Sequence, residues 1–137
     1  MSKKIPKTTN SEKQILEVLW DEQTALTSSE IVNVSDDRTW KSSSVHLLLN
    51  SLLKKGLVQV AGFKKTTKNY ARTFEPTMTR EEYSIKQIRQ DQRNTNRTLS
   101  RLFTALLEEE NNPELLDELS RMVDARRKEL EENQNVK

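Results

Sequence analysis

The chain has 137 residues with 33% hydrophobic and 32% charged side chains, and its formal net charge is +2. This composition is lean for a compact globule and is typical of a helical protein with much exposed surface. The absence of cysteine excludes disulfides, thiolate metal sites and cysteine catalysis, and the single histidine leaves little material for a zinc site.

The N-terminal segment, MSKKIPKTTN, is basic and is not followed by an apolar run. Its lysines, Lys3, Lys4 and Lys7, predict a disordered basic arm. No stretch of the chain approaches membrane-spanning length, so we expect a soluble cytoplasmic protein with no membrane partner. Residues 1–78 hold 12 Lys and Arg against 8 Asp and Glu, and residues 79–137 hold 11 against 13, so the excess of positive charge lies in the first part.

Two short amphipathic helices follow, and each begins with a capping box. Thr9 pairs with Glu12 at the start of the first helix, and Thr27 pairs with Glu30 at the start of the second. Apolar residues then recur at helical spacing, namely Ile15, Leu16, Leu19 and Trp20 in the first helix and Ile31 and Val34 in the second. The polar loop SDDRT ends this pair of helices.

The third predicted helix, in residues 42–56, has an apolar and a polar side. Its apolar stripe is expected to be buried and consists of Val45, Leu48, Leu49, Leu52 and Leu53. The opposite side carries Ser43, His46, Leu47 and Asn50. Lys54 and Lys55 suit the negative end of the helix dipole, and Gly56 can take the left-handed conformation that closes a helix.

A two-stranded hairpin with a cationic tip follows the third helix. The segments LVQVAGF and YARTFEP alternate with period two, and the basic stretch KKTTKN separates them. The tip contains Lys64, Lys65 and Lys68, and the return strand carries Arg72. Three short helices followed by a basic hairpin predict a mainly α protein with a small β-hairpin wing, which is a winged helix-turn-helix domain over residues 1–78.

The remaining residues, 79–137, predict a helical dimerisation domain. Thr79 and Glu82 form a third capping box, a long run without glycine or proline follows, and Asn112 and Pro113 begin another helix. The apolar seams of these helices contain Leu99, Leu102, Phe103, Leu106, Leu107, Leu115, Leu119, Met122 and Val123. Two such helices cannot bury their seams on each other alone, so we predict that they pack on a second copy of the chain.

Three motifs resemble those of the penicillinase-repressor family, the winged-helix repressors of β-lactam-resistance and copper-export operons. They are T-x-x-E…W in residues 9–20, W-x-x-x-[ST]-[IV]-x-x-L-L-x-x-L-x-K-K-G in residues 40–56, and F-x-P…E-E-Y in residues 74–83. The resemblance covers nearly the whole chain. It implies a homodimer with an N-terminal DNA-binding domain that represses transcription by occupying a promoter.

The sequence also departs from the patterns of this family. Members often have threonine and arginine where this chain has Leu47 and Ser51, and β-lactam repressors have lysine and arginine where it has Ser43 and His46. The chain lacks the cysteines of the copper-responsive members and the Asn-Phe bond at which β-lactam repressors are cut. An unknown inducer or a protease therefore stays open as a further partner.

The polar start of the third helix is the candidate for reading bases, because such helices enter the major groove with their N-terminal residues. The base-reading candidates are Ser42, Ser43, Ser44, His46, Leu47 and Asn50. One of the serines is expected to act only as a helix cap, and His46 has the alternative interpretation of a solvated surface residue. Leu47 is expected to pack either on a thymine methyl group or on a neighbouring loop.

Phosphate contacts are expected from the second helix and the hairpin. The candidates are Thr27, Ser28, Lys41, Lys64, Lys65, Lys68 and Arg72, with a merely solvated basic turn as the alternative for the hairpin. We interpret Trp20 and Trp40 as packing residues. Arginines recur every four residues at Arg89, Arg93, Arg97 and Arg101, either as a solvated face or as partners of acidic residues in a second subunit.

The sequence therefore predicts a homodimeric, sequence-specific transcriptional repressor that binds a pseudo-palindromic operator in double-stranded DNA. An enzyme is not expected, because there is no cysteine, no glycine-rich phosphate loop and no acid–base constellation around the single histidine. No cofactor or metal is expected either. The alternative is a helical protein–protein interaction module whose winged-helix domain does not bind DNA.

Overall fold

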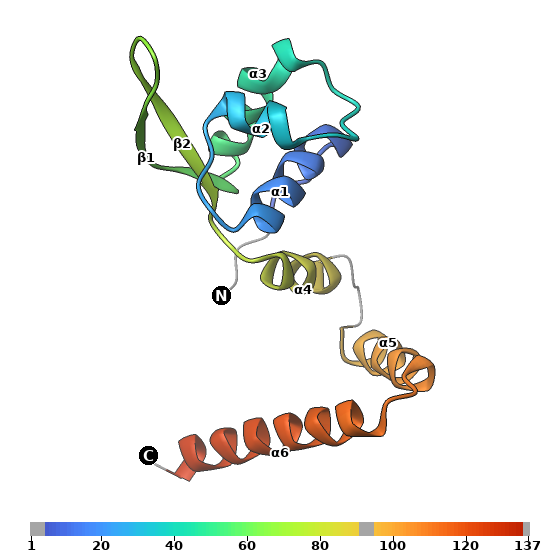
Figure 1. Cartoon of the computed structure of the whole chain (residues 1–137). Helices are drawn as coiled ribbons and strands as arrows, with labels where there is room; N and C mark the ends of the chain where they lie inside the picture. Colours follow the sequence, from blue (N-terminus) through green and yellow to red (C-terminus); the bar gives the residue numbers. More distant parts are fainter. Residues whose placement is uncertain (1–4, 91–94, 136–137) are drawn as a thin grey trace. The chain divides into compact units, whose positions relative to one another are not determined.

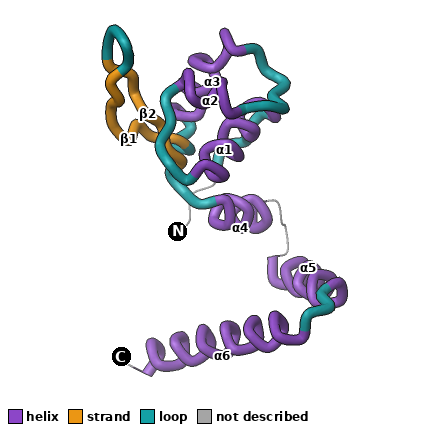
Figure 2. Tube along the Cα trace, in the orientation of Figure 1, coloured by secondary structure: helices purple, strands orange, loops and turns teal. Residues whose placement is uncertain are grey.

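The computed structural model of the protein describes residues 5–90 and 95–135 (Figure 1). The chain divides into two compact units, residues 1–91 and residues 92–137. The elements of the first unit are α1 (Asn10–Glu22), α2 (Ser28–Val34), the 3₁₀ turn η1 (Ser42–Ser44), α3 (Val45–Lys54), β1 (Val58–Lys65), β2 (Tyr70–Pro76) and α4 (Arg80–Gln90). Figure 2 shows that the second unit is helical, with α5 (Thr95–Glu109) and α6 (Pro113–Asn135). Among the described residues, no helix is both long and apolar enough to cross a membrane.

Helices α1, α2 and α3 share one apolar core with the base of the hairpin. The core residues are Ile15, Leu16, Leu19, Ile31, Val45, Leu49, Leu52, Leu57, Val58 and Phe74, all buried. Leu26 pairs with Phe74 through two backbone hydrogen bonds of 3.1 and 2.8 Å, which attaches β2 to the segment between α1 and α2. Three helices and an attached two-stranded hairpin make this unit a winged helix-turn-helix domain.

The predicted capping boxes are confirmed at all three sites. Thr9 caps α1 and Thr27 caps α2, each with the glutamate three residues later. The reciprocal bonds between Thr79 and Glu82 are both 3.1 Å and precede α4. Helix α3 ends at Lys54, and Gly56 two residues later has a φ of 73°, the left-handed conformation that favours glycine, as predicted. These local signals therefore set the starts of α1, α2 and α4 and the end of α3.

The hairpin is antiparallel and contains one irregularity. The strands pair from Val58 with Pro76 out to Lys65 with Tyr70, and the register shifts between Val60 and Gly62. Strand β1 thus includes Lys64 and Lys65, whereas the sequence pattern predicted both residues in the turn between the strands. Because a bulge inserts one residue on one strand, it decides which side chains beyond it share a face of the sheet.

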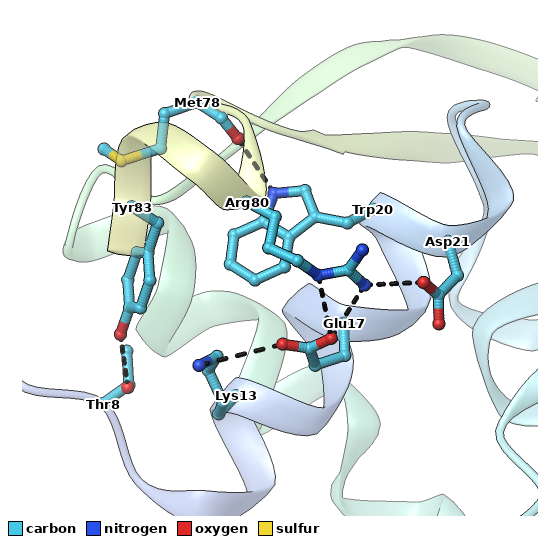
Figure 3. Close-up of polar contacts among 8 residues, drawn as sticks. All are labelled: Thr8, Lys13, Glu17, Trp20, Asp21, Met78, Arg80 and Tyr83. Atoms are coloured by element: carbon cyan, nitrogen blue, oxygen red, sulfur yellow. Dashed lines mark hydrogen bonds and ion pairs between the residues drawn. The ribbon is translucent and has the colours of Figure 1, made fainter. Parts of the chain in front are cut away.

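Helix α4 packs on α1, so the first unit extends beyond the expected boundary at residue 78 (Figure 3). The ring of Tyr83 is buried, and its centroid lies 5.4 Å from that of Trp20. The Trp20 Nε1 donates a hydrogen bond of 2.9 Å to the carbonyl of Met78, and Arg80 binds carboxylates of α1. An aromatic contact and an ion pair thus hold the start of α4 in place.

The N-terminal segment also contacts α4. The backbone N–H of Ile5 donates to Gln90 Oε1 over 2.7 Å, and Gln90 Nε2 donates to the Ile5 carbonyl over 2.9 Å. Ile5 is buried, and the carbonyl of Lys7 accepts a hydrogen bond from Lys55. The expectation of a disordered arm is therefore wrong for residues 5–7, because these contacts hold them against the domain. Lys3 and Lys4 lie outside the described residues.

The second unit contains two amphipathic helices. Asn112 caps α6, since its Oδ1 accepts from the backbone N–H of Glu114 over 3.0 Å, as the sequence predicted. None of the residues 96–135 is buried. The predicted arginine series does not lie on one described helix: Arg89 is on α4, Arg97 and Arg101 are on α5, and Arg93 lies outside the described residues.

Candidate nucleic-acid interface

The exposed face of η1 and α3 carries the residues predicted to read bases. Ser42, Ser43, His46, Leu47 and Asn50 are exposed, whereas Ser44 is half-buried where the 3₁₀ turn joins the helix. Val45, Leu49 and Leu52 on the opposite side are buried in the core. The predicted division of this helix into an inner and an outer side is therefore confirmed.

Leu47 is unusual on this face because it is a large apolar residue with 74% of its surface exposed. No described residue covers it, so the interpretation that it packs on a neighbouring loop does not hold. An exposed leucine next to His46 and Asn50 offers an apolar contact beside two groups that form hydrogen bonds. That combination suits the edge of an A·T base pair, which presents a methyl group next to polar atoms in the major groove.

Helix α2 and the start of α3 enclose a shallow hollow. Its lining residues are Ser28, Ser29, Val32, Asn33, Ser42, Val45 and His46. The structure thus brings the predicted phosphate contact Ser28 close to the base-reading candidates Ser42 and His46. Thr27 does not fit its predicted role, because it is buried and its hydroxyl accepts a hydrogen bond of 3.2 Å from the Glu30 N–H. The exposed Ser29, which sequence reasoning missed, lies at the same hollow.

The lysines of the wing differ in their surroundings. Lys64 Nζ lies 2.6 Å from Glu30 Oε2, so this amine is already paired with a carboxylate of α2. The hydrogen bond from Lys64 lowers the pKa of Glu30, and the backbone N–H of Thr27 lowers it further. Within the described part of the chain, no carboxylate lies within ion-pair distance of Lys65, Lys68 or Arg72. Lys64 therefore holds the wing against α2, and the other three cations are free for an anionic partner.

Two other predictions concern residues beside α3. Lys41 is exposed and occupies the N-cap position of η1, where it can contact a phosphate. Trp40 and Trp20 are both buried, which confirms their interpretation as packing residues. The guanidinium of Arg38 lies 5.4 Å from the ring centroid of Trp40 and covers one face of it.

Sequence reasoning missed two exposed aromatic rings on the wing. Phe63 is 69% exposed and Tyr70 is 66% exposed, although both belong to paired strands. The alternation of YARTFEP placed Tyr70, Arg72 and Phe74 on one face, but only the position of the bulge shows that Phe63 joins them. The sequence pattern therefore indicated a shared face only for the residues of the return strand, β2.

The predicted dimer residues form an apolar surface on α5 and α6. Leu99 and Leu119 are half-buried, and the others, Leu102, Phe103, Leu106, Leu107, Leu115, Met122 and Val123, are exposed in the single chain. Their exposure leaves the second unit without a core of its own. Among the described residues, no group of three or more Asp, Glu or His side chains is placed to hold a metal ion.

Comparison with known proteins relates this arrangement to a family. No curated protein sequence matches the chain. The crystal structure of the adhesin competence repressor (AdcR) from Streptococcus pyogenes is similar over 91% of this chain and 82% of that one, with 21% identity and a TM-score of 0.40. A PadR family transcription regulator from Clostridium difficile R20291 is similar over 72% of this chain and 99% of that one, with 16% identity and a TM-score of 0.43. The family model described as penicillinase repressor matches residues 8–125, and the chain therefore belongs to the penicillinase-repressor family.

Proposed function

We propose that the protein is a homodimeric transcriptional repressor that binds a pseudo-palindromic operator in double-stranded DNA. The observation that carries the proposal is the exposed polar face of η1 and α3, with Ser42, Ser43, His46 and Asn50 on a helix whose other side is buried. A surface helix that is firmly packed on one side and rich in hydrogen-bonding groups on the other suits insertion into a major groove.

The surroundings of this helix favour a polyanionic partner. Lys41 precedes it, Ser28 and Ser29 lie across the hollow, and Lys65, Lys68 and Arg72 on the wing have no carboxylate partner among the described residues. Cations and hydroxyls around a base-reading helix supply the phosphate contacts that fix its position on the duplex. We therefore assign the affinity mainly to these groups and the sequence preference to η1 and α3.

The second unit supports the dimeric part of the proposal. Its apolar side chains, including Phe103, Leu106 and Met122, are exposed in the single chain over two consecutive helices. An apolar surface of this extent is unfavourable in water unless a partner covers it. A second copy of the chain is the partner that also produces two base-reading helices related by a two-fold axis, as a palindromic operator requires.

The proposal is tested by selecting duplexes from a random library and measuring the affinity of the selected duplex as salt rises. We expect a selected site with two inverted half-sites and an affinity that falls steeply with salt, because phosphate contacts release counterions. Binding to a random duplex should be weaker but should show a similar salt dependence. Failure to select any sequence, together with weak dependence on salt, would instead favour the alternative of a protein interaction module.

A further inference from the structure

Helix α4 is packed more firmly at its start than at its end. Tyr83 is the buried residue of this helix and packs on Trp20, and Arg80 Nη2 lies 2.8 Å from Glu17 Oε2 of α1 (Figure 3). Residues 84–90, which follow Tyr83, are half-buried or exposed. The last turns of α4 therefore gain little from packing, and they stay on the first unit only if something else holds them.

The N-terminal segment, residues 5–8, supplies this attachment, and we call it the N-terminal strap. The side-chain amide of Gln90 pairs with both backbone groups of Ile5. Its Oε1 accepts from the N–H over 2.7 Å, and its Nε2 donates to the carbonyl over 2.9 Å. About two turns earlier on α4, the hydroxyl of Tyr83 lies 2.9 Å from that of Thr8. The strap thus contacts α4 at two points, one of them in its last turn.

The strap is itself fixed to the rest of the domain. Ile5 is buried in the common apolar core, and the carbonyl of Lys7 accepts a hydrogen bond of 2.8 Å from Lys55, the C-cap residue of α3. Within the described part of the chain, residues 84–90 form no other hydrogen bond and no ion pair with another element. The strap therefore decides whether the end of α4 stays attached to the first unit.

The end of α4 is also the point at which the chain leaves the first unit, because the second unit begins at residue 92. We infer that the N-terminal strap sets the spacing between the two half-sites of the operator, with Gln90 as a positioning residue that acts through α4. One added base pair turns the second half-site by about 35° around the duplex axis. A connection that starts from a fixed helix end therefore accepts one spacing, whereas one that starts from a loose end accepts several.

This inference rests on the proposed function, since it needs a dimer that binds two half-sites at once. A strap that only stabilised the first unit would behave differently, because its loss would reduce binding at every spacing by the same factor. A strap that sets the spacing changes the relative affinities for different spacings. It leaves binding to a single half-site unchanged, because no second half-site has to be reached.

The test compares Gln90→Leu with the wild type on duplexes in which the spacer between the selected half-sites is lengthened or shortened by single base pairs. Leucine suits a helix as well as glutamine does, but it can form neither hydrogen bond with Ile5. We expect the wild type to lose about tenfold in affinity for each base pair added or removed, and Gln90→Leu to lose about threefold or less. On a duplex with one half-site the two proteins should bind equally.

Gln87→Leu is the matched control. It makes the same change at a half-buried position of the same helix, where the glutamine forms no side-chain hydrogen bond with any described residue. We expect this variant to keep the spacing preference of the wild type. A loss of preference in Gln87→Leu equal to that in Gln90→Leu would overturn the assignment to the strap.

Amide hydrogen exchange gives the second readout, because it reports the opening of the last turns of α4 without any DNA. We expect faster exchange at residues 84–90 in Gln90→Leu and unchanged exchange in α3. Equal spacing preferences of wild type and Gln90→Leu would overturn the inference, whatever the exchange rates, and would leave the proposed function intact. A wild type that selected no pair of inverted half-sites would overturn the proposed homodimeric repressor and this inference with it.

Discussion

The amine of Lys55, at the end of α3, lies 2.7 Å from the carboxylate of Glu12, in the first turn of α1. Glu12 is 2% exposed, and its second oxygen accepts a hydrogen bond of 2.6 Å from the Ser51 hydroxyl. The same carboxylate completes the capping box with Thr9. One buried acid therefore ties the start of α1 to the end of α3.

The first prediction concerns the acid stability of this contact. Burial raises the pKa of Glu12, but hydrogen bonds from Lys55, Ser51 and Thr9 outweigh burial and lower it from 4.5 to about 2. A lowered folded-state pKa contributes stability that is fully present above the unfolded value of 4.5 and is lost as the pH falls through about 2. The shift corresponds to about 3 kcal/mol of unfolding free energy at neutral pH.

Urea unfolding of wild type and Glu12→Gln, followed by tryptophan fluorescence from pH 7 to pH 2.5, measures this contribution. We expect the variant to be less stable by about 3 kcal/mol at pH 7, and the difference to shrink as the pH falls below about 4.5. Glu22→Gln, in an exposed position at the end of the same helix, is the matched control. A difference between wild type and Glu12→Gln that stayed constant with pH would contradict the assignment of the lowered pKa to Glu12.

The second prediction concerns the packing of α4 on α1. Tyr83→Ala removes a ring that is 1% exposed and should lower the unfolding free energy by about 3–5 kcal/mol. Tyr83→Phe keeps the ring and loses only the hydrogen bond of 2.9 Å with the Thr8 hydroxyl, at a cost of about 1 kcal/mol. Calorimetry of both variants tests whether Tyr83→Ala loses more unfolding free energy than Tyr83→Phe. Equal stability of Tyr83→Ala and wild type would mean that α4 is not part of the first unit.

The starts of α1, α2 and α4 and the end of α3 could be predicted from the sequence because their signals are local, whereas the single long helix expected after Thr79 is two helices, α4 and α5. Capping boxes at Thr9, Thr27 and Thr79 and the glycine at residue 56 act within a few residues, and the structure confirms each of them. The packing of Tyr83 on Trp20 joins residues far apart in the sequence, so nothing in the local pattern indicated that α4 belongs to the first unit. The same holds for the contact between Lys55 and Glu12, since Lys55 alone suggested only a helix end.

In the candidate site, too, features set by local spacing could be predicted from the sequence, and features set by contacts between distant residues could not. The outer side of α3 could be predicted, because helical spacing fixes which residues lie opposite the buried stripe. Lys64, Lys65 and Lys68 form one basic run in the sequence, yet Lys64 is bound to Glu30 and the other two are not. That distinction depends on which way each strand residue points and on what lies across from it. A bulge between Val60 and Gly62 sets the direction, and the sequence alone does not place a bulge.

The third prediction concerns the dimer. Leu106→Asp places a charge in the middle of the apolar surface of α5, and burying it unpaired between two subunits would cost several kcal/mol. We expect monomers in sedimentation and a large loss of operator affinity, because two half-sites are no longer bound together. Thr104→Asp, on another side of the same helix, adds the same charge and should remain dimeric. A dimeric Leu106→Asp protein would contradict the assignment of this surface.

The last prediction concerns the outer side of α3. His46 is exposed in the first turn of α3, at the hollow shared with α2, whereas Leu49 is buried on the opposite side. If the outer side carries the sequence information, His46→Ala should leave the fold and the dimer intact and reduce affinity for the selected operator roughly tenfold. Leu49→Ala should instead lower the unfolding free energy by about 2–5 kcal/mol, because it opens a cavity in the core.

Selection on randomised half-sites separates these two roles, because it reports base preference independently of how much folded protein is present. We expect His46→Ala to lose its preference at one symmetric base pair in each half-site and to keep it elsewhere, since one imidazole can bond to one base edge. Leu49→Ala should select the same sequence as the wild type from whatever fraction remains folded. Identical preferences for wild type and His46→Ala would show that His46 does not read sequence, and would leave Ser42, Ser43, Leu47 and Asn50 as the residues of the outer side to vary next.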